Sequence, residues 1–233
     1  MVIATDDILA LVLDRMQQRG FDAAQAQLTD TRRDELQADF NQASMLRTTN
    51  NLSLSLSGLV QGRRASATIN KCAPQDIDEA IEELWASANA AVADDANAIA
   101  EQQSPATFET GPQRGDRELM YQRLDEFLGH SASAHPTVIL GMASVTHELA
   151  NKRYVNSNGV DFSSARGSYE AGAMFTARDG EDVSSFSYSG ASLHALDVPL
   201  SQIASFERLM SETAQHVRTQ KVPDKFTGDM IIT

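Results

Sequence analysis

Apolar residues recur every three to four positions in four parts of the chain, which is the spacing of amphipathic helices. Gly20 ends the first of these runs, and Pro74 suits the first turn of the second. The third helix is expected over residues 116–129, and the last is expected to be capped by Asp197 and opened by Pro199. The apolar positions are Ile8, Leu11, Val12 and Met16; Ile77, Ala80, Ile81, Leu84, Trp85 and Ala88; Leu119, Met120, Leu124, Phe127 and Leu128; and Leu200, Ile203, Ala204, Met210 and Val217.

Between these helices the period changes to two. Leu52, Leu54 and Leu56 alternate strictly with serines, and this pattern predicts a strand with one buried and one solvent-facing side. Such strands are typical of an antiparallel sheet. Further strands are expected at 36–40, where Leu36, Ala38 and Phe40 would share the buried side, and at 65–69, 138–149 and 160–177.

Glycine and asparagine mark the expected turns. Asn158-Gly159 and Asp179-Gly180 are strong tight-turn signals. Gly167 and Gly172 fall inside an expected strand, where glycine indicates a bulge or a bend. Two further turns are expected at Asn50-Asn51 and at residues 58–62.

The resulting order is helix, strands, helix, connector, helix, strands, helix. It predicts an α+β fold with antiparallel sheets and flanking helices, and the repeated order allows two similar helix-strands-helix subdomains. No parallel βαβ alternation is visible. The expected division is residues 1–95 and 116–220 for the subdomains, with 96–115 as a connector rich in Gln, Pro and Gly.

Residues 221–233 form a separate segment. A linker from Pro223 to Gly228 is followed by Met230-Ile231-Ile232-Thr233, which is typical of the start of a strand. Four residues are few for a complete strand. We therefore expect this segment to be a junction to a further, carboxy-terminal domain of a longer protein.

The net charge of the chain argues against one class of partner, the nucleic acids. The 233 residues have a formal net charge of −13, and a field of that sign repels phosphate. We therefore expect no nucleic-acid partner. No segment resembles a signal peptide or a membrane span, so no membrane association and a cytoplasmic location are expected.

The single cysteine excludes an internal disulfide framework. Cys72 has no histidine near it in the sequence and lies just before Pro74, at an apparent helix start. A structural role is expected for this thiol.

His147-Glu148 is the first candidate for metal chemistry. Zinc peptidases use a helical His-Glu-x-x-His, because residues four apart share one helix face and both imidazoles reach one ion. Here Asn151 stands at the fourth position after His147, Lys152 stands at the fifth, and the segment has the pattern of a strand. We therefore interpret His147-Glu148 as a polar strand end.

The remaining candidates are equally incomplete. His130, His135, His194 and His216 have no second ligand at a recognisable spacing. Neither Ser187-Tyr188-Ser189-Gly190 nor Gly167-Ser168 forms the Gly-x-Ser-x-Gly elbow of a serine nucleophile, and no phosphate-binding glycine loop occurs. The acidic pairs Asp94-Asp95 and Glu181-Asp182 have the context of solvated loops. The chain is thus predicted to contain no catalytic, cofactor-binding or metal-binding residues of its own.

Three stretches resemble the amino-terminal domain of the TldD/PmbA family, once called modulators of DNA gyrase. The first is the region of residues 45–71 before the helix at Pro74, which includes Gly62-Arg63-Arg64-Ala65-Ser66-Ala67-Thr68. The second, Val155-Asn156-Ser157-Asn158-Gly159-Val160, is similar to the family's Asn-Ser-x-Gly turn. The third, residues 222–232, resembles the junction between the family's two domains. Lys225-Phe226-Thr227-Gly228-Asp229 is most similar to the metal-free PmbA or TldE-like type.

The resemblance implies a cytosolic peptide-processing system in which two related subunits pair as a homo- or heterodimer. One type of subunit is a metallopeptidase with a His-Glu-x-x-x-His helix and a distant Cys as zinc ligands, and the other type lacks the metal. In the catalytic type these ligands lie beyond the junction, so none is transferred to this chain. Zinc is implied only for a catalytic partner subunit.

Two functions of different classes remain open at this point. In the first, the chain is the amino-terminal domain of a peptidase-assembly subunit, inactive alone, which forms scaffold and a groove for an extended peptide. Long antiparallel strands could accept such a peptide at an exposed edge. In the second, the chain is a non-enzymatic protein-binding module, a regulator of the gyrase-modulator kind.

Overall fold

The computed structural model describes residues 5–218, 225 and 227–230. Four α-helices are formed in this part of the chain, namely α1 (Thr5–Arg19), α2 (Pro74–Ala90), α3 (Arg117–Ala134) and α4 (Phe206–Gln215), with a short 3-10 helix η1 (Leu200–Gln202). The strands are β1 (Ala23–Asp39), β2 (Gln42–Val60), β3 (Arg63–Ile69), β4 (Ala106–Thr110), β5 (Val138–Asn156), β6 (Asp161–Asp179), β7 (Asp182–Val183) and β8 (Ser187–Leu193).

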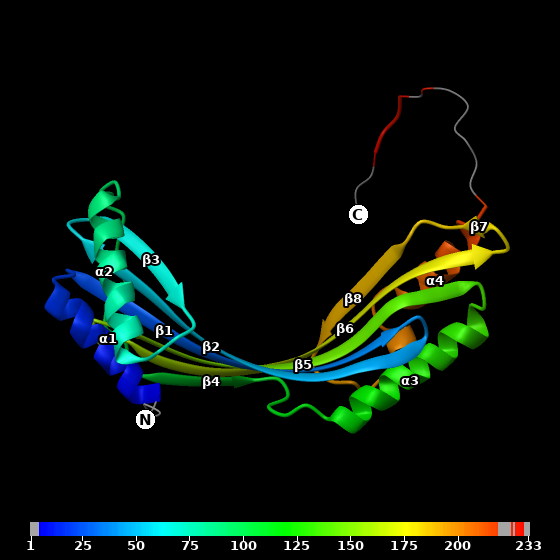
Figure 1. Cartoon of the computed structure of the whole chain (residues 1–233), viewed down its shortest axis with the longest axis horizontal. Helices are drawn as coiled ribbons and strands as arrows, with labels where there is room; N and C mark the ends of the chain where they lie inside the picture. The colour runs from blue at the N-terminus through cyan, green and yellow to red at the C-terminus, as the bar shows by residue number, and fades with distance from the viewer. Residues whose placement is uncertain (1–4, 219–224, 226, 231–233) are drawn as a thin grey trace.

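The strands form one curved, predominantly antiparallel sheet with the order β3-β2-β1-β5-β6-β4, and β7 and β8 also pair with β6. Figure 1 shows that β1, β2, β5 and β6 run the whole length of the molecule and bend between its two ends. The α+β antiparallel fold expected from the sequence is confirmed. No helix in the described ranges is long and apolar enough to span a bilayer.

Helices cover one face of the sheet at each end. At the first end, buried residues of α1 and α2 pack on even-numbered positions of β1 and on β2, and we call this cluster the first core. Ala24, Ala26 and Leu28 form its floor on β1, and Phe21 meets the edge of Trp85 with 5.1 Å between the ring centroids. The helical stripes expected near Ile8 and Ile77 are confirmed here.

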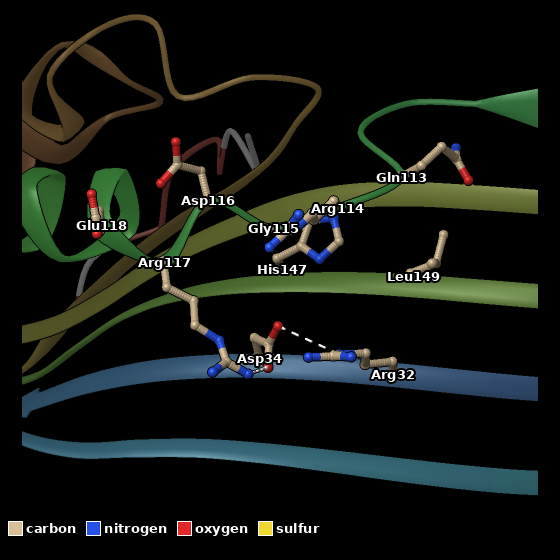
Figure 2. Close-up of a pocket in the computed structure, with 10 residues that line it drawn as sticks. All are labelled: Arg32, Asp34, Gln113, Arg114, Gly115, Asp116, Arg117, Glu118, His147 and Leu149. Atoms are coloured by element: carbon tan, nitrogen blue, oxygen red, sulfur yellow. Dashed lines mark hydrogen bonds and ion pairs between the residues drawn. The ribbon is translucent and has the colours of Figure 1, made fainter.

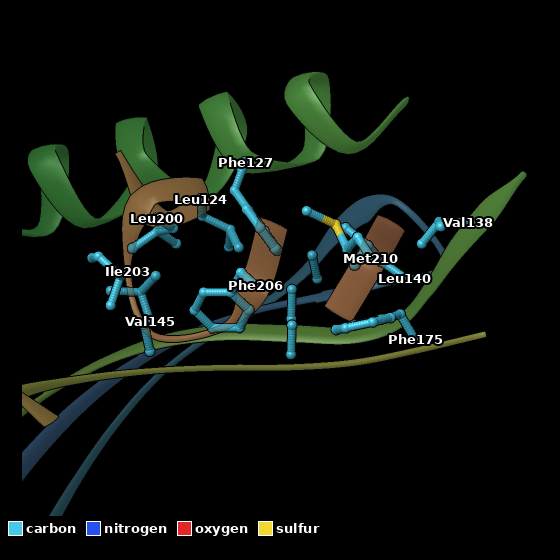
Figure 3. Packing of buried hydrophobic residues seen from close by; sticks show 14 of the residues in the cluster. Leu124, Phe127, Val138, Leu140, Val145, Phe175, Leu200, Ile203, Phe206 and Met210 are labelled. Atoms are coloured by element: carbon cyan, nitrogen blue, oxygen red, sulfur yellow. The ribbon is translucent and has the colours of Figure 1, made fainter. Parts of the chain in front are cut away.

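At the second end, α3, η1 and α4 pack on the same face and bury what we call the second core. Figure 3 shows Phe206 of α4 among residues of α3 and the sheet, and its ring centroid lies 5.2 Å from that of Phe127. Leu36 and Ala38 of β1 belong to this core, so β1 contributes to both ends. The division into two subdomains at residues 95 and 116 stays a prediction.

Several local predictions were wrong for identifiable reasons. Asn50 and Asn51 lie inside β2, because pairing with Arg32 and Thr31 of β1 extends the strand through them. Phe40 is not on the buried side of a strand. It forms the β1–β2 turn with a φ of 47° and is 75 % exposed.

The last predicted helix is interrupted. Ala204 has a φ of 49°, a left-handed conformation that a right-handed helix cannot contain, and it separates η1 from α4. The expected helix over 116–129 continues to Ala134, and Asp116 caps its start, since its side chain accepts a hydrogen bond from the Leu119 N–H at 3.0 Å.

The connector contains a strand that the sequence pattern did not indicate. β4 pairs parallel with β6, from Ala106 beside Phe162 to Thr110 beside Arg166. The expected bulges at Gly167 and Gly172 are absent, since both residues pair with β5 in unbroken register. Most of the junction at 221–233 lies outside the described residues, and so do the last three residues of the expected strand start at 230–233.

Candidate functional site

The middle of the sheet differs from both ends. We define the polar middle as residues 30–34 of β1, 47–51 of β2 and 147–151 of β5, which lie side by side in the sheet. None of these residues belongs to either core. Along β1 the buried even-numbered positions give way to exposed Asp30 and Arg32, followed by buried Asp34. The polar middle is therefore a stretch where the sheet presents polar groups instead of a hydrophobic layer.

One edge of the sheet is open beside the polar middle. β2 pairs with β3 only from Leu54 to Val60, and within the described chain no strand pairs with the outer side of residues 42–53. This open edge of β2 is about two typical strand lengths long. It contains neither proline nor lysine, residues that commonly protect edge strands from pairing. The open edge thus retains its capacity to add a further strand.

A cavity of about 770 Å³ lies against the helix-covered face of the polar middle. Its wall on one side is β1 and β5, and on the other it is residues 113–118 at the start of α3, as Figure 2 shows. We call residues 111–118 the crossing segment, because they lead from β4 across the sheet into α3. The lining residues are Arg32, Asp34, Gln113, Arg114, Gly115, Asp116, Arg117, Glu118, His147 and Leu149.

Asp34 is the centre of a charged network at the floor of this cavity. The residue is only 4 % exposed, and its carboxylate accepts hydrogen bonds from Arg117 and, at 2.6 Å, from the Thr48 hydroxyl. Arg32 lies 3.7 Å from the other carboxylate oxygen. Burial alone would raise the pKa of Asp34, but the hydrogen bonds and the positive charges of Arg117 and Arg32 outweigh it, so the pKa is lowered. Asp34 therefore stays ionised and fixes the start of α3 beside the open edge.

His147 of β5 holds the crossing segment against the sheet. Its Nε2 lies 2.7 Å from the Pro112 carbonyl oxygen, so this nitrogen carries the proton and donates. Its ring packs against Tyr169 with 5.0 Å between centroids, and the Tyr169 hydroxyl accepts a hydrogen bond from the Asp116 N–H at 2.9 Å. His147 is 2 % exposed, so it is a buried structural group.

Two glycines allow the crossing segment to approach the sheet. A Cβ at Gly167 would lie 1.8 Å from the Pro112 carbonyl oxygen, and one at Gly111 would lie 1.9 Å from the Gly167 oxygen. No side chain fits at either distance. Gly167 is thus required for close backbone contact, which explains a glycine inside the unbroken β6 ladder.

The open, helix-free face of the polar middle is also polar. Arg33 of β1 reaches Glu148 of β5 at 3.6 Å and Glu170 of β6 at 4.0 Å. Near the open edge, Arg47 of β2 pairs with Glu35 at 2.6 Å. An extended chain beside β2 would therefore find hydrogen-bonding side chains on both faces of the sheet.

The structure places the expected metal candidates apart. His147 lies in the middle of β5 and not at a strand end, because the strand continues to Asn156. Neighbouring residues of a strand point to opposite faces, so His147 and Glu148 cannot approach one ion. Asn151 follows at a strand distance of about 13 Å. The family's His-Glu-x-x-x-His zinc site does not fit these residues.

The remaining histidines and the cysteine lie in different environments. His130 and His135 are brought to the carboxylate of Glu207, a contact that spans more than seventy residues and that local spacing could not show. His194 and His216 are exposed. Burial, with a smaller contribution from Asp76, raises the pKa of the Cys72 thiol, which makes it a weaker nucleophile at neutral pH.

No local sequence pattern singled out Asp34, Arg32, Arg117 or Tyr169. One signal was available, because Asp34 occupies the same strand register as buried Leu36 and Ala38. A charged residue in an apolar register needs a partner when it is buried. Arg117, which supplies that partner, is distant in sequence, and only the fold brings it to Asp34.

No protein-family model and no curated protein matches this sequence. Among solved structures, TldE from Thermococcus kodakarensis has a TM-score of 0.68 at 15% identity, and the match covers 90% of this chain and 47% of that one. A candidate modulator of DNA gyrase from Bacteroides thetaiotaomicron has a TM-score of 0.66 at 17% identity, covering 95% and 52%. A candidate modulator of a DNA gyrase from Thermotoga maritima has 0.59 at 12%, covering 91% and 47%.

The chain shares the fold of these proteins. It spans about half of the length of each of them. The fold implied by the sequence resemblance to the TldD/PmbA family is thereby confirmed.

Proposed function

We propose that this chain is the amino-terminal part of a TldD/PmbA-type protein and that it binds extended peptide for a cytoplasmic peptide-processing assembly. Two observations support the family: the sequence motifs around residues 45–71 and 155–160, and the fold shared with TldE. In this proposal the chain supplies scaffold and a peptide groove. The zinc chemistry belongs to a catalytic partner subunit, with which the full-length protein forms a dimer.

The open edge of β2 is the observation on which the peptide-binding proposal rests. An exposed strand edge offers unpaired backbone N–H and C=O groups to another extended chain. A peptide paired there would lie beside Thr48, whose hydroxyl is held in the Asp34–Arg117 network. Its side chains would alternate between the cavity face and the helix-free face.

Backbone pairing makes a testable demand on the ligand. An antiparallel strand bonds to an edge through every second residue, so only one alternating set of its amides faces β2. We therefore expect a fluorescent extended peptide to lose most of its affinity when the alternating set of amides that faces β2 is N-methylated. N-methylation of the other alternating set, with the same number of methyl groups, should have little effect.

The two methylated peptides are matched controls, because they have equal composition and differ only in the face that is blocked. Equal affinity of both peptides would contradict pairing at a strand edge. Arg47→Ala, at the open edge of β2, tests whether a side chain of this strand also contributes to peptide affinity. Arg64→Ala on β3, outside the open edge of β2, serves as its control.

Catalysis is placed outside this chain in our proposal. We expect the purified chain to cleave no peptide, with or without added zinc. Cleavage by the chain alone that chelation abolishes would contradict the proposal. Capture of a second TldD/PmbA-type subunit in a pull-down would support it, whereas selective capture of an unrelated protein, without peptide binding, would favour the regulatory binding module.

A further inference from the structure

Glu207 connects the end of α3 to the start of α4. Its two carboxylate oxygens contact two imidazoles: the Nε2 of His130 lies 2.7 Å from one oxygen, and the Nε2 of His135 lies 3.0 Å from the other. His130 is in the last turns of α3 and His135 caps it, while Glu207 is in the first turn of α4. These three side chains form a cluster on the second core, separate from the polar middle.

The arrangement of donor atoms suits a small cation. One ligand atom from each of the three residues can be chosen so that all lie within 4.8 Å of one another. In a tetrahedral zinc site with bonds of about 2.0–2.1 Å, ligand atoms are about 3.3 Å apart. Binding an ion would require side-chain rotations that bring the three ligand atoms closer together. Glu207 has the freedom for them, since its side chain is 52 % exposed.

We propose that His130, His135 and Glu207 bind a divalent transition-metal ion such as Zn²⁺. Two imidazole nitrogens and one carboxylate oxygen are ligands that zinc, copper, nickel and cobalt accept, whereas Mg²⁺ and Ca²⁺ require oxygen ligands. A fourth position is left for water. The formal net charge of −13 also favours cation binding to this chain.

Binding of the ion requires no net loss of protons from two neutral imidazoles. Without metal, each Nε2 carries the proton that points at Glu207. On binding, a neutral imidazole keeps one proton but carries it on Nδ1, so that Nε2 can bind the ion. The carboxylate of Glu207 faces both imidazoles, so one of its oxygens can become the third ligand.

The structural consequence is a link across the second core. Glu207 follows Phe206 directly, and Phe206 packs against Phe127 of α3. An ion held by both helices would fix the broken η1–α4 segment against α3. An ion that binds only the folded chain stabilises it by mass action.

The test is thermal unfolding of the full chain, first in EDTA and then with added Zn²⁺ or Mg²⁺. We expect micromolar Zn²⁺ to raise Tm by about 5 °C, and Mg²⁺ to leave it unchanged. Co²⁺ should give visible d–d absorption with one ion per chain. His135→Gln and Glu207→Gln should abolish both signals, whereas His194→Gln, at an exposed histidine elsewhere, should retain them.

Two results would overturn the proposal. One is the absence of a Tm increase and of Co²⁺ absorption in the unaltered chain. The other is an increase that survives in Glu207→Gln, which would identify adventitious binding at other surface groups. Because Co²⁺ absorption is measured on the folded chain at low temperature, a general loss of stability in a variant does not imitate the expected loss of binding.

Discussion

At each end of the sheet, helices bury a layer of aliphatic and aromatic side chains, and in the middle the same strands present Asp30, Arg32 and Asp34. The strand backbone is continuous through all three regions. The ends are held by apolar burial. The middle is held by the Asp34–Arg117 and His147–Pro112 contacts and by glycines that permit close approach.

This difference shows which region stabilises the fold and which is available to a ligand. Apolar burial is the dominant favourable contribution to folding, so the two cores account for most of the stability. The polar middle contributes less and retains an open strand edge and a cavity. Substitutions in the two cores should therefore reduce the free energy of unfolding by much more than substitutions in the polar middle.

The largest effect is expected in the second core. Phe127→Ala removes a ring that is 2 % exposed and packs on Phe206, and such substitutions cost about 3–5 kcal/mol of unfolding free energy. Thr49→Ala, on the open edge, should change stability by less than about 0.5 kcal/mol. Urea unfolding of both variants measures the contrast. Equal losses would show that the polar middle is as important for stability as the core.

A smaller effect is expected where the crossing segment meets β6. Gly167→Ala places a Cβ against the Pro112 carbonyl and should destabilise the chain by about 3 kcal/mol, because only backbone atoms can move aside. The control is Gly129→Ala in α3, where an added Cβ meets nothing within 4 Å. That change should stabilise by about 0.5–1 kcal/mol, since alanine favours helix more than glycine does. An unchanged free energy of unfolding in Gly167→Ala would contradict the close backbone contact between the crossing segment and β6.

The smallest of the three effects concerns Asp34. Asp34→Asn should cost about 1–2 kcal/mol at neutral pH, because it removes charge-assisted hydrogen bonds at a buried site. Asp30→Asn, at an exposed position on the same face, should cost almost nothing.

The pH dependence of this effect has a definite sign. The pKa of Asp34 is lower in the folded chain than the ordinary value of 3.8. Its contribution is therefore fully present above that value and is lost as pH falls through the lowered pKa. The stability difference between the original chain and Asp34→Asn should shrink with acidification. A difference that is constant down to pH 2 would contradict the role of the ionised carboxylate.

The sequence predicted much of the two ends. The helical stripes near Ile8, Ile77 and Leu124 and the period-two pattern at Leu54 and Leu56 depend on local spacing, and the structure buries each of them. The tight turns at Asn158-Gly159 and Asp179-Gly180 also depend on two adjacent residues. Local physics is sufficient for features of this kind.

The polar middle could not be predicted in the same way. Its open edge depends on β3 being shorter than β2, and its cavity depends on a segment that crosses from β4 to α3. The turn signal of Asn50-Asn51 was overridden by long-range pairing with β1. The contact of His130 and His135 with Glu207 likewise joins positions that only the packing of α4 on the second core brings together.

Amide hydrogen exchange with and without an extended peptide tests the peptide-binding claim most directly. We expect the peptide to slow exchange in residues 42–53 of β2 and to leave residues 54–60 of the same strand unchanged, because β3 already pairs with the outer side of the latter. Protection that is absent from residues 42–53 under saturating peptide, or that is confined to another part of the chain, would contradict the account.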